Sequence, residues 1–343
     1  MASNKVVKGP NILFINYLRV IATLLITNSH YGKIWPIDDL AAGGLLGNIL
    51  FFAASGFCLF NLKETFGKWY LKRIIKIYPI MVIFTLLTVF IGDYSLNGVM
   101  DAIRLFLYPT NYIFLVWLMV LYIAFYIIAW LSKSCDKAIH ITLIIVLLFW
   151  TLTYFIFVDK SFYHIDDVSK PFILFLYFLS MLIGALFKKY ADKSSENNAN
   201  KQIIYQSLLL LISLVVYFGS KIAFSKLQTI AFWQILNQFS IISVLYFIFA
   251  VFMGLEEQLK KLPVWINKAV NFCAGITLHI YIVQFVVIRR LEDLAFPVNL
   301  LATTFMILAL ACAVYFAEYF IKNGIMMLID KVKGKNKDAE SNY

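Results

Sequence analysis

Charged residues are scarce in this chain: Asp, Glu, Lys and Arg together make up 14% of its 343 residues. Acidic side chains are the scarcer kind, 19 against 30 basic ones, which leaves a formal net charge of +11. Hydrophobic residues fill 62% of the sequence. A soluble domain carries about a quarter charged residues. This composition therefore excludes a soluble domain and predicts a protein that crosses a membrane several times.

Cysteine and histidine are also few, with four residues of each. The histidines form no H-x-x-x-H pair and no mixed cluster with cysteine, so no metal site is predicted. The cysteines stand singly, which argues against a disulfide framework and leaves them as packing residues; they are Cys58, Cys135, Cys273 and Cys312. No nucleic-acid-binding module interrupts the apolar segments. The positive charge therefore indicates contact with anionic membrane lipids and not with nucleic acid.

Ten apolar segments are long enough to cross a membrane as helices, which takes about 20 residues each. The loops between them are short, with no room for a separate catalytic domain. We therefore predict an all-α fold, a polytopic transmembrane bundle of about ten spanning helices, in a single domain over residues 1–333. The predicted spans are Ile12–Ser29, Gly44–Leu62, Ile74–Gly92, Asn111–Leu131, Ile139–Val158, Pro171–Phe187, Gln202–Gly219, Ile230–Met253, Phe272–Ile288 and Pro297–Ile321.

Two polar stretches have little to bury and are predicted to be unfolded. Ala191–Asn200 is a polar linker, and Gly334–Tyr343 is a charged, disordered tail. Pro79, Pro171 and Pro297 are expected near the ends of spans, where they do not interrupt a helix.

Basic residues are distributed unevenly among the loops. The two termini and every second loop hold 21 of the 30 Lys and Arg residues, the other loops hold eight, and Arg19 lies within the first span. Cytoplasmic loops carry the excess of Lys and Arg, so both termini are predicted to be cytoplasmic. The chain is expected in the cell membrane, and its preference for Lys over Arg is typical of an AT-rich bacterial genome.

Two ionisable residues mark the first predicted span. Arg19 lies inside it and His30 directly follows its last residue. Eleven positions on an α-helix are three turns plus about 20°, so both side chains point the same way, roughly 16 Å apart along the axis. An intramembrane charge costs several kcal/mol and marks a functional site by default. The structural alternatives are an Arg that reaches the interface and a His that merely begins a loop.

The loop between the second and third spans is basic, with Lys68, Lys72, Arg73 and Lys76 on the predicted cytoplasmic side. Such a cluster is suited to binding the phosphates of a nucleotide-bearing donor by charge-assisted hydrogen bonds. The alternative is an ordinary basic anchor of a cytoplasmic loop.

Four strings along the chain carry a family resemblance. LRVIATLLITNSH (Leu18–His30) has ten residues between its Arg and its His, and ILFFAASGFCLF (Ile49–Phe60) contains an FF-x-x-SGF element. WYLKRIIKIYP (Trp69–Pro79) and ITLHIYIVQF (Ile276–Phe285) follow in that order. Together they resemble the R-x10-H signature and the three later motifs of the membrane acyltransferase family 3.

The resemblance implies transfer of an acyl group, commonly acetyl from cytoplasmic acetyl-CoA, to a hydroxyl of a cell-surface glycan or a lipid-linked sugar. Acetyl-CoA is then a donor substrate, and no permanently bound cofactor is implied. The family's essential Arg and His carry over to Arg19 and His30. Arg73, Lys72 and Lys76 become candidates for binding the donor.

The sequence departs from the family pattern at two positions. Lys76 stands where the second Arg of the R-x-x-R element is found, and Lys lacks the bidentate fork of Arg. Gln284 stands where a His is often found, and an amide cannot act as a base.

The residues fit acyl transfer on chemical grounds as well. A sugar hydroxyl near neutral pH needs a base within hydrogen-bond reach, which contributes about 10² to 10⁴ in rate. His30 is the candidate base, and a covalent acyl-His intermediate is the other route. Arg19 is a candidate for placing the donor or stabilising the oxyanion. A structural ion pair of Arg19 with Glu318 in the last span is the alternative.

Other polar residues have simpler interpretations. Ser55 and the pair Gly43 and Gly47 suit helix packing, because small residues let helices approach closely. His279 lies within a span and suits a hydrogen bond to a neighbouring helix. We expect the loop Asp159–Lys170 to be exposed to solvent, and contact of this loop with a glycan is the alternative.

Two other functions fit the same composition. A transporter of polysaccharide or lipid-linked sugar is the second candidate, but no inverted repeat, no paired interrupted helices and no intramembrane Asp are evident. A non-catalytic scaffold or sensor is the other candidate, but such a protein has no need of an Arg and a His on one helix face. The sequence does not indicate an oligomeric state or the identity of the acceptor.

Overall fold

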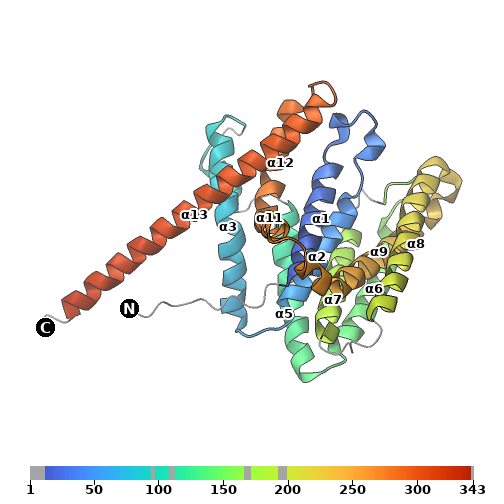
Figure 1. The fold of residues 1–343 in the computed structure, drawn as a ribbon, viewed down its shortest axis with the longest axis horizontal. Helices are drawn as coiled ribbons and strands as arrows, with labels where there is room; N and C mark the ends of the chain where they lie inside the picture. The colour runs from blue at the N-terminus through green and yellow to red at the C-terminus, as the bar shows by residue number, and fades with distance from the viewer. Residues whose placement is uncertain (1–11, 94–96, 108–112, 166–170, 192–198, 341–343) are drawn as a thin grey trace. The chain divides into compact units, whose positions relative to one another are not determined.

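The computed structural model describes residues 12–93, 97–107, 113–165, 171–191 and 199–340. Every regular element in these ranges is a helix, as Figure 1 shows. The α-helices are α1 (Leu13–Ser29), α2 (Gly44–Leu59), α3 (Phe66–Phe90), α4 (Val99–Leu107), α5 (Ile113–Ser134), α6 (Ala138–Phe157), α7 (Phe172–Tyr190), α8 (Ala199–Lys226), α9 (Ile235–Gly254), α10 (Glu256–Lys260), α11 (Val264–Gly275), α12 (Thr277–Leu291) and α13 (Val298–Glu340). Short 3-10 helices are η1 (Gly32–Ile34), η2 (Asp38–Leu40) and η5 (Gln228–Trp233).

The predicted all-α membrane fold is confirmed, and the count of spans differs from the prediction. Within the described residues, eight helices are long and apolar enough to cross a membrane, and α1 is a shorter apolar helix. The predicted span Phe272–Ile288 is not one straight helix, because the chain bends at Ile276, between α11 and α12. If α11 and α12 cross the membrane together, they make a ninth span.

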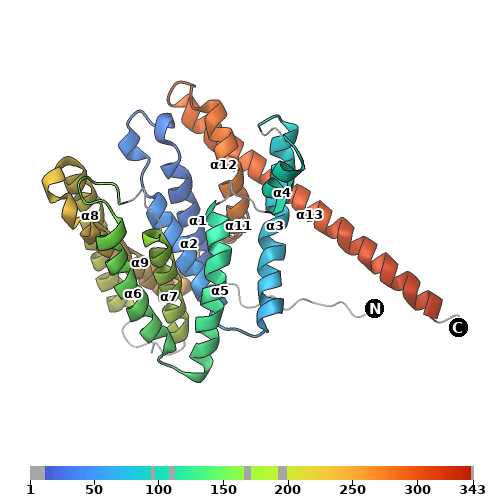
Figure 2. The same cartoon turned by 180° about the vertical axis from the view of Figure 1, so that it is seen from behind.

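The chain divides into two compact units. The first holds residues 1–29, 42–66 and 117–275, and its centre is α2. This helix packs against α1 on one side and α7 on the other, while α8 pairs with α9. The second unit holds residues 30–41, 67–116 and 276–343. In it, α12 and α13 lie side by side, as both views show (Figures 1 and 2).

Close packing of α2 depends on glycines. A Cβ atom added to Gly56 would lie 2.0 Å from the backbone oxygen of Met181 in α7. A Cβ atom added to Gly184 would lie 1.9 Å from the oxygen of Ala53. Gly47 approaches Ala22 in α1 in the same way, at 2.6 Å. Small residues therefore let three helices of the first unit approach one another closely, as predicted for Gly47.

Apolar side chains also cover the outer faces of several helices. On α8, Ile204, Leu208, Leu211 and Val215 are all exposed, and α6 exposes a similar set. A helix that is apolar on every side is typical of a segment surrounded by lipid and not by water. These faces support the membrane location independently of the helix lengths.

Two expectations about local structure differ from what is observed, and a third concerns residues that are mostly not described. Pro79 lies inside α3 and not at a span end, because α3 begins at Phe66 and includes the expected loop. Membrane helices tolerate an internal proline where neighbouring groups satisfy the freed carbonyl. Helix α13 continues to Glu340, through most of the stretch from Gly334 that we expected to be disordered. A long helix adds residues at little cost once it has formed. Most of the predicted linker at 191–200 lies outside the described residues.

Candidate active site

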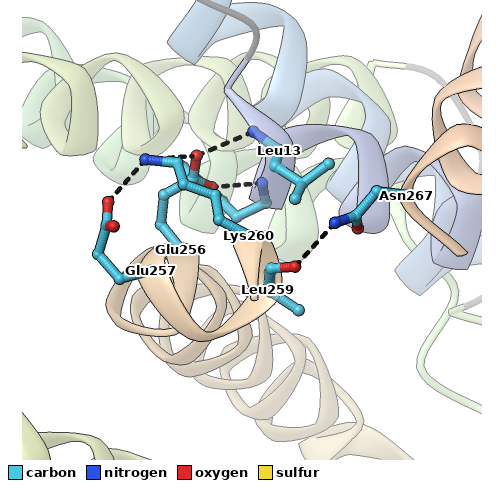
Figure 3. Close-up of polar contacts among 7 residues, drawn as sticks. Leu13, Glu256, Glu257, Leu259, Lys260 and Asn267 are labelled. Carbon is cyan, nitrogen blue, oxygen red and sulfur yellow. Dashed lines mark hydrogen bonds and ion pairs between the residues drawn. The ribbon is translucent and has the colours of Figure 1, made fainter. Parts of the chain in front are cut away.

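The start of helix α1, which carries Arg19, is capped by the carboxylate of a residue that is distant in the sequence. The two side-chain oxygens of Glu256 accept the backbone N–H groups of Leu13, at 3.1 Å, and Phe14, at 2.7 Å (Figure 3). The first N–H groups of a helix have no partner within the helix and carry partial positive charge. A carboxylate at this position satisfies two of them and stabilises the helix dipole.

Two further hydrogen bonds hold the first turns of α1 against α11. The side-chain amide of Asn16 donates to Asn271 at 2.8 Å, and the Tyr17 hydroxyl donates to Asn267 at 3.0 Å. The Asn267 amide in turn donates to the backbone oxygen of Leu259 (Figure 3). The rotation of α1 about its own axis, which sets where Arg19 points, is therefore fixed by polar contacts.

Arg19 lies one helical turn beyond these contacts and is half-buried. Its backbone oxygen accepts the Thr23 hydroxyl at 2.9 Å. Among the described residues, its guanidinium has no carboxylate and no other hydrogen-bond partner. An Arg with five free donors at such a place can bind an anion or a carbonyl oxygen of a substrate.

His30 directly follows the last residue of α1 and belongs to the second unit. Its ring contacts the ring of Phe285 on α12 edge to face, with centroids 4.7 Å apart. His30 is an exposed residue, although protein atoms crowd one side of its ring. The surrounding protein atoms disfavour the charged ring, so burial lowers the pKa of His30 below its ordinary value. The neutral imidazole, the form that acts as a base, is therefore the main species at neutral pH.

The segment after His30 is attached to the α12 and α13 hairpin by three polar contacts. The hydroxyls of Tyr31 and Thr304 share a hydrogen bond at 3.1 Å. The Asn299 amide donates to the backbone oxygen of Ile34 at 2.9 Å, and Asn299 is itself buried. A third contact joins Lys33 and Glu292 at the surface. These contacts hold the chain on the C-terminal side of His30.

The predicted donor-binding residues lie on a helix and not in a loop. Lys72, Arg73 and Lys76 are all on α3, at a spacing that places them on one helix face. The Arg73 guanidinium lies over the ring of Trp69, 5.3 Å from its centre, and its Nε atom is buried without a hydrogen bond. Lys72 and Lys76 are exposed. The result is a basic stripe on α3, made of Lys72, Arg73 and Lys76.

The predicted site residues fall in two units. Arg19 belongs to the first unit, whereas His30 and the basic stripe belong to the second. The alternative partner of Arg19 is already engaged, because the carboxylate of Glu318 binds His279 and Lys322. The FF-x-x-SGF element has a structural role here, since Phe52 and Ser55 are buried and Gly56 contacts α7.

Sequence reasoning did not pair His279 with Glu318, although it considered each residue alone. His279 Nε2 lies 2.9 Å from Glu318 Oε2, and both side chains are buried. Gln284, five residues further along α12, is fully buried, and neither polar atom of its amide has a hydrogen-bond partner in the part of the chain that the structure describes. A buried ionisable residue within an apolar helix is the signal that pointed to His279 and Glu318.

The helices of spanning length place the chain in the class of polytopic helical membrane proteins, and a His directly follows its first helix. The chain matches the sequence model of the acyltransferase 3 family, described as an acyltransferase domain, over residues 12–318. It therefore belongs to this family of membrane acyltransferases, as its four motifs predicted. No curated protein and no solved structure matches the chain.

Proposed function

We propose that this protein is an O-acyltransferase of the cell membrane that transfers acetyl from cytoplasmic acetyl-CoA to a hydroxyl of a cell-surface polysaccharide or lipid-linked sugar. The observation that carries the proposal is the state of His30: a neutral, partly accessible imidazole at the end of a helix that is fixed at its other end. Membership of the acyltransferase 3 family supplies the reaction class.

In the proposed reaction His30 accepts the proton of the sugar hydroxyl as the oxygen attacks the thioester carbonyl. This general-base role contributes about 10² to 10⁴ in rate. The Phe285 ring restricts the orientation of the imidazole, and the contacts of Tyr31 and Ile34 restrict the backbone that follows it. Arg19, with no carboxylate among the described residues, places the donor or stabilises the negative charge on the thioester oxygen. The basic stripe on α3 binds the phosphates of CoA.

Topology follows the distribution of basic residues, with both termini in the cytoplasm. Acetyl-CoA then reaches the protein from the side that carries most of the Lys and Arg residues. The acceptor approaches His30 from the opposite side. No stably bound cofactor takes part in the proposal.

The proposal is tested with the purified chain in liposomes, supplied with radiolabelled acetyl-CoA and with either octyl glucoside or extracted lipid-linked sugars as acceptor. We expect label in the acceptor with the wild type and at least a 100-fold lower rate with His30→Ala. His140→Ala is the matched control, because His140 lies elsewhere and contacts Tyr190. Full transfer by His30→Ala at equal protein would contradict the role of His30. Movement of unmodified acceptor across the bilayer without acylation would favour a transporter.

A further inference from the structure

A second histidine lies on the same helix as the residue that supports His30. His279 is on α12, six residues before Phe285, and only 3% of its side chain is exposed. It is an ionisable group inside the membrane segment, where such groups are rare and costly. The mechanism proposed above does not use it.

Three residues form a short chain of polar contacts from the surface to this histidine. Lys322 binds one carboxylate oxygen of Glu318, and His279 Nε2 binds the other at 2.9 Å. The exposed fractions of the side chains fall along this chain, from 42% for Lys322 to 8% for Glu318 and 3% for His279. Glu318 thus has both oxygens paired, and it orients the imidazole as the carboxylate does in a catalytic triad.

The other ring nitrogen, Nδ1, is buried and makes no hydrogen bond with any described residue. Buried polar atoms are nearly always satisfied, and each exception needs an explanation. Because Nε2 is held by Glu318, Nδ1 is the atom left to exchange a proton with a bound molecule.

The position of His279 fits the leaving-group side of an acyl transfer. Six residues along an α-helix are about 9 Å of rise, so His279 lies about 9 Å from Phe285 along the axis of α12, on a face about 120° away. Beyond Lys322 the sequence of α13 is rich in Lys, as the proposed cytoplasmic side is.

We propose that His279, oriented by Glu318, is a second catalytic residue that protonates the sulfur of the acyl donor as it leaves. This inference rests on the proposed function. The hydroxyl oxygen bonds to the acyl carbon, and its proton passes to His30. The C–S bond then breaks, the sulfur leaves with the bonding electrons, and it takes the proton from His279 Nδ1. His30 returns its proton to water and His279 regains one from water, so the products are an ester and a free thiol.

The test compares two acetyl thioesters, which differ in size and in how much their leaving group needs a proton. Acetyl-CoA leaves an alkyl thiolate, whereas S-(4-nitrophenyl) thioacetate leaves an aryl thiolate that is stable at neutral pH. His279→Gln is the variant, because its amide nitrogen replaces Nε2 toward Glu318 and nothing replaces Nδ1. We expect kcat/KM to fall about 100-fold with acetyl-CoA and by less than about threefold with the aryl thioester. His140→Gln is expected to match the wild type with both donors.

The proposal requires the wild type to use both donors and the variant to distinguish them. Equal loss with both donors, no loss with acetyl-CoA, or no use of the aryl thioester by the wild type would overturn it. If His279→Gln does not fold, Glu318→Gln is measured instead, with the same pattern expected at about tenfold. Absence of transfer by the wild type from acetyl-CoA to either octyl glucoside or lipid-linked sugars is a different result, which overturns the proposed function itself.

Discussion

Glu256 accepts the backbone N–H of Phe14 at 2.7 Å, although the two residues are 242 positions apart in the sequence. The same carboxylate accepts the N–H of Leu13. A residue at the start of α10 thereby caps the helix that carries Arg19 and ends at Ser29, directly before His30. The contact connects the stability of the fold with the placement of the candidate site.

Glu256→Ala is predicted to destabilise the protein. The variant leaves two N–H groups at the start of α1 without their acceptor, and loss of a capping side chain costs about 1 to 2 kcal/mol. The thermal unfolding midpoint in detergent is the measurement. Glu257→Ala is the control, because Glu257 is exposed and binds only Lys260 (Figure 3). Equal midpoints for the two variants would contradict a capping role.

The sequence was sufficient for the membrane class, the family and most of the long helices. Apolar segments of spanning length reveal helices by local pattern alone. The expectation that Arg19 and His30 share one helix is wrong by one residue, because α1 ends at Ser29. The capping contact was not predictable in this way. Nothing near Leu13 identifies an acceptor more than 200 residues away, because such pairings depend on how the helices pack.

The same reasoning explains the bend between α11 and α12 and the pairing of His279. Apolar character continues through Phe272–Ile288, so hydropathy predicts one span, and only packing shows the break at Ile276. Glu318 was identified as a buried charge that needs a partner, but the sequence does not say which helix lies beside the last span. The choice of His279 over Arg19 depended on which helix lies beside α13.

Gly56→Ala is predicted to disrupt the packing of α2 against α7. The added methyl group would lie 2.0 Å from the backbone oxygen of Met181, and a backbone atom cannot move aside as a flexible side chain does. Overpacking of this kind costs about 1 to 3 kcal/mol or more. Gly219→Ala is the matched control, since Gly219 also lies within a helix and has nothing within 4 Å of the added atom. We expect a lower unfolding midpoint, or loss of monodisperse protein, for Gly56→Ala alone.

The proposed topology predicts the labelling of two thiols on either side of α6. Cys135 is exposed in the connection before α6, which should face the cytoplasm, and Ser161 is exposed after it. In a variant without Cys58, Cys273 and Cys312, an impermeant thiol reagent added to intact cells should leave Cys135 unlabelled. Addition of Ser161→Cys should produce labelling from outside. Labelling of Cys135 but not of position 161 in intact cells would reverse the orientation.

The basic stripe on α3 is predicted to bind the phosphates of the donor. Replacing both Lys72 and Lys76 with Gln removes two charges at exposed positions. We expect KM for acetyl-CoA to rise about tenfold, with kcat nearly unchanged, because uniform binding is lost. Acetyl-pantetheine, which lacks the nucleotide, is the internal control and should show no change. An equal rise for both donors would argue against phosphate binding.

The pH dependence of transfer provides a test of His30 as the base. Burial lowers the pKa of His30 below its ordinary value of about 6.5. The neutral ring is the active form, so kcat/KM should be constant at neutral pH and should fall as the pH decreases through the lowered pKa. Phe285→Ala, which removes the ring against the imidazole, should return the midpoint toward 6.5, since it exposes the charged form to water. Phe305→Ala, an exposed aromatic on α13, is the control. A midpoint above 6.5 in the wild type, or one that Phe285→Ala does not raise, would contradict this account of His30.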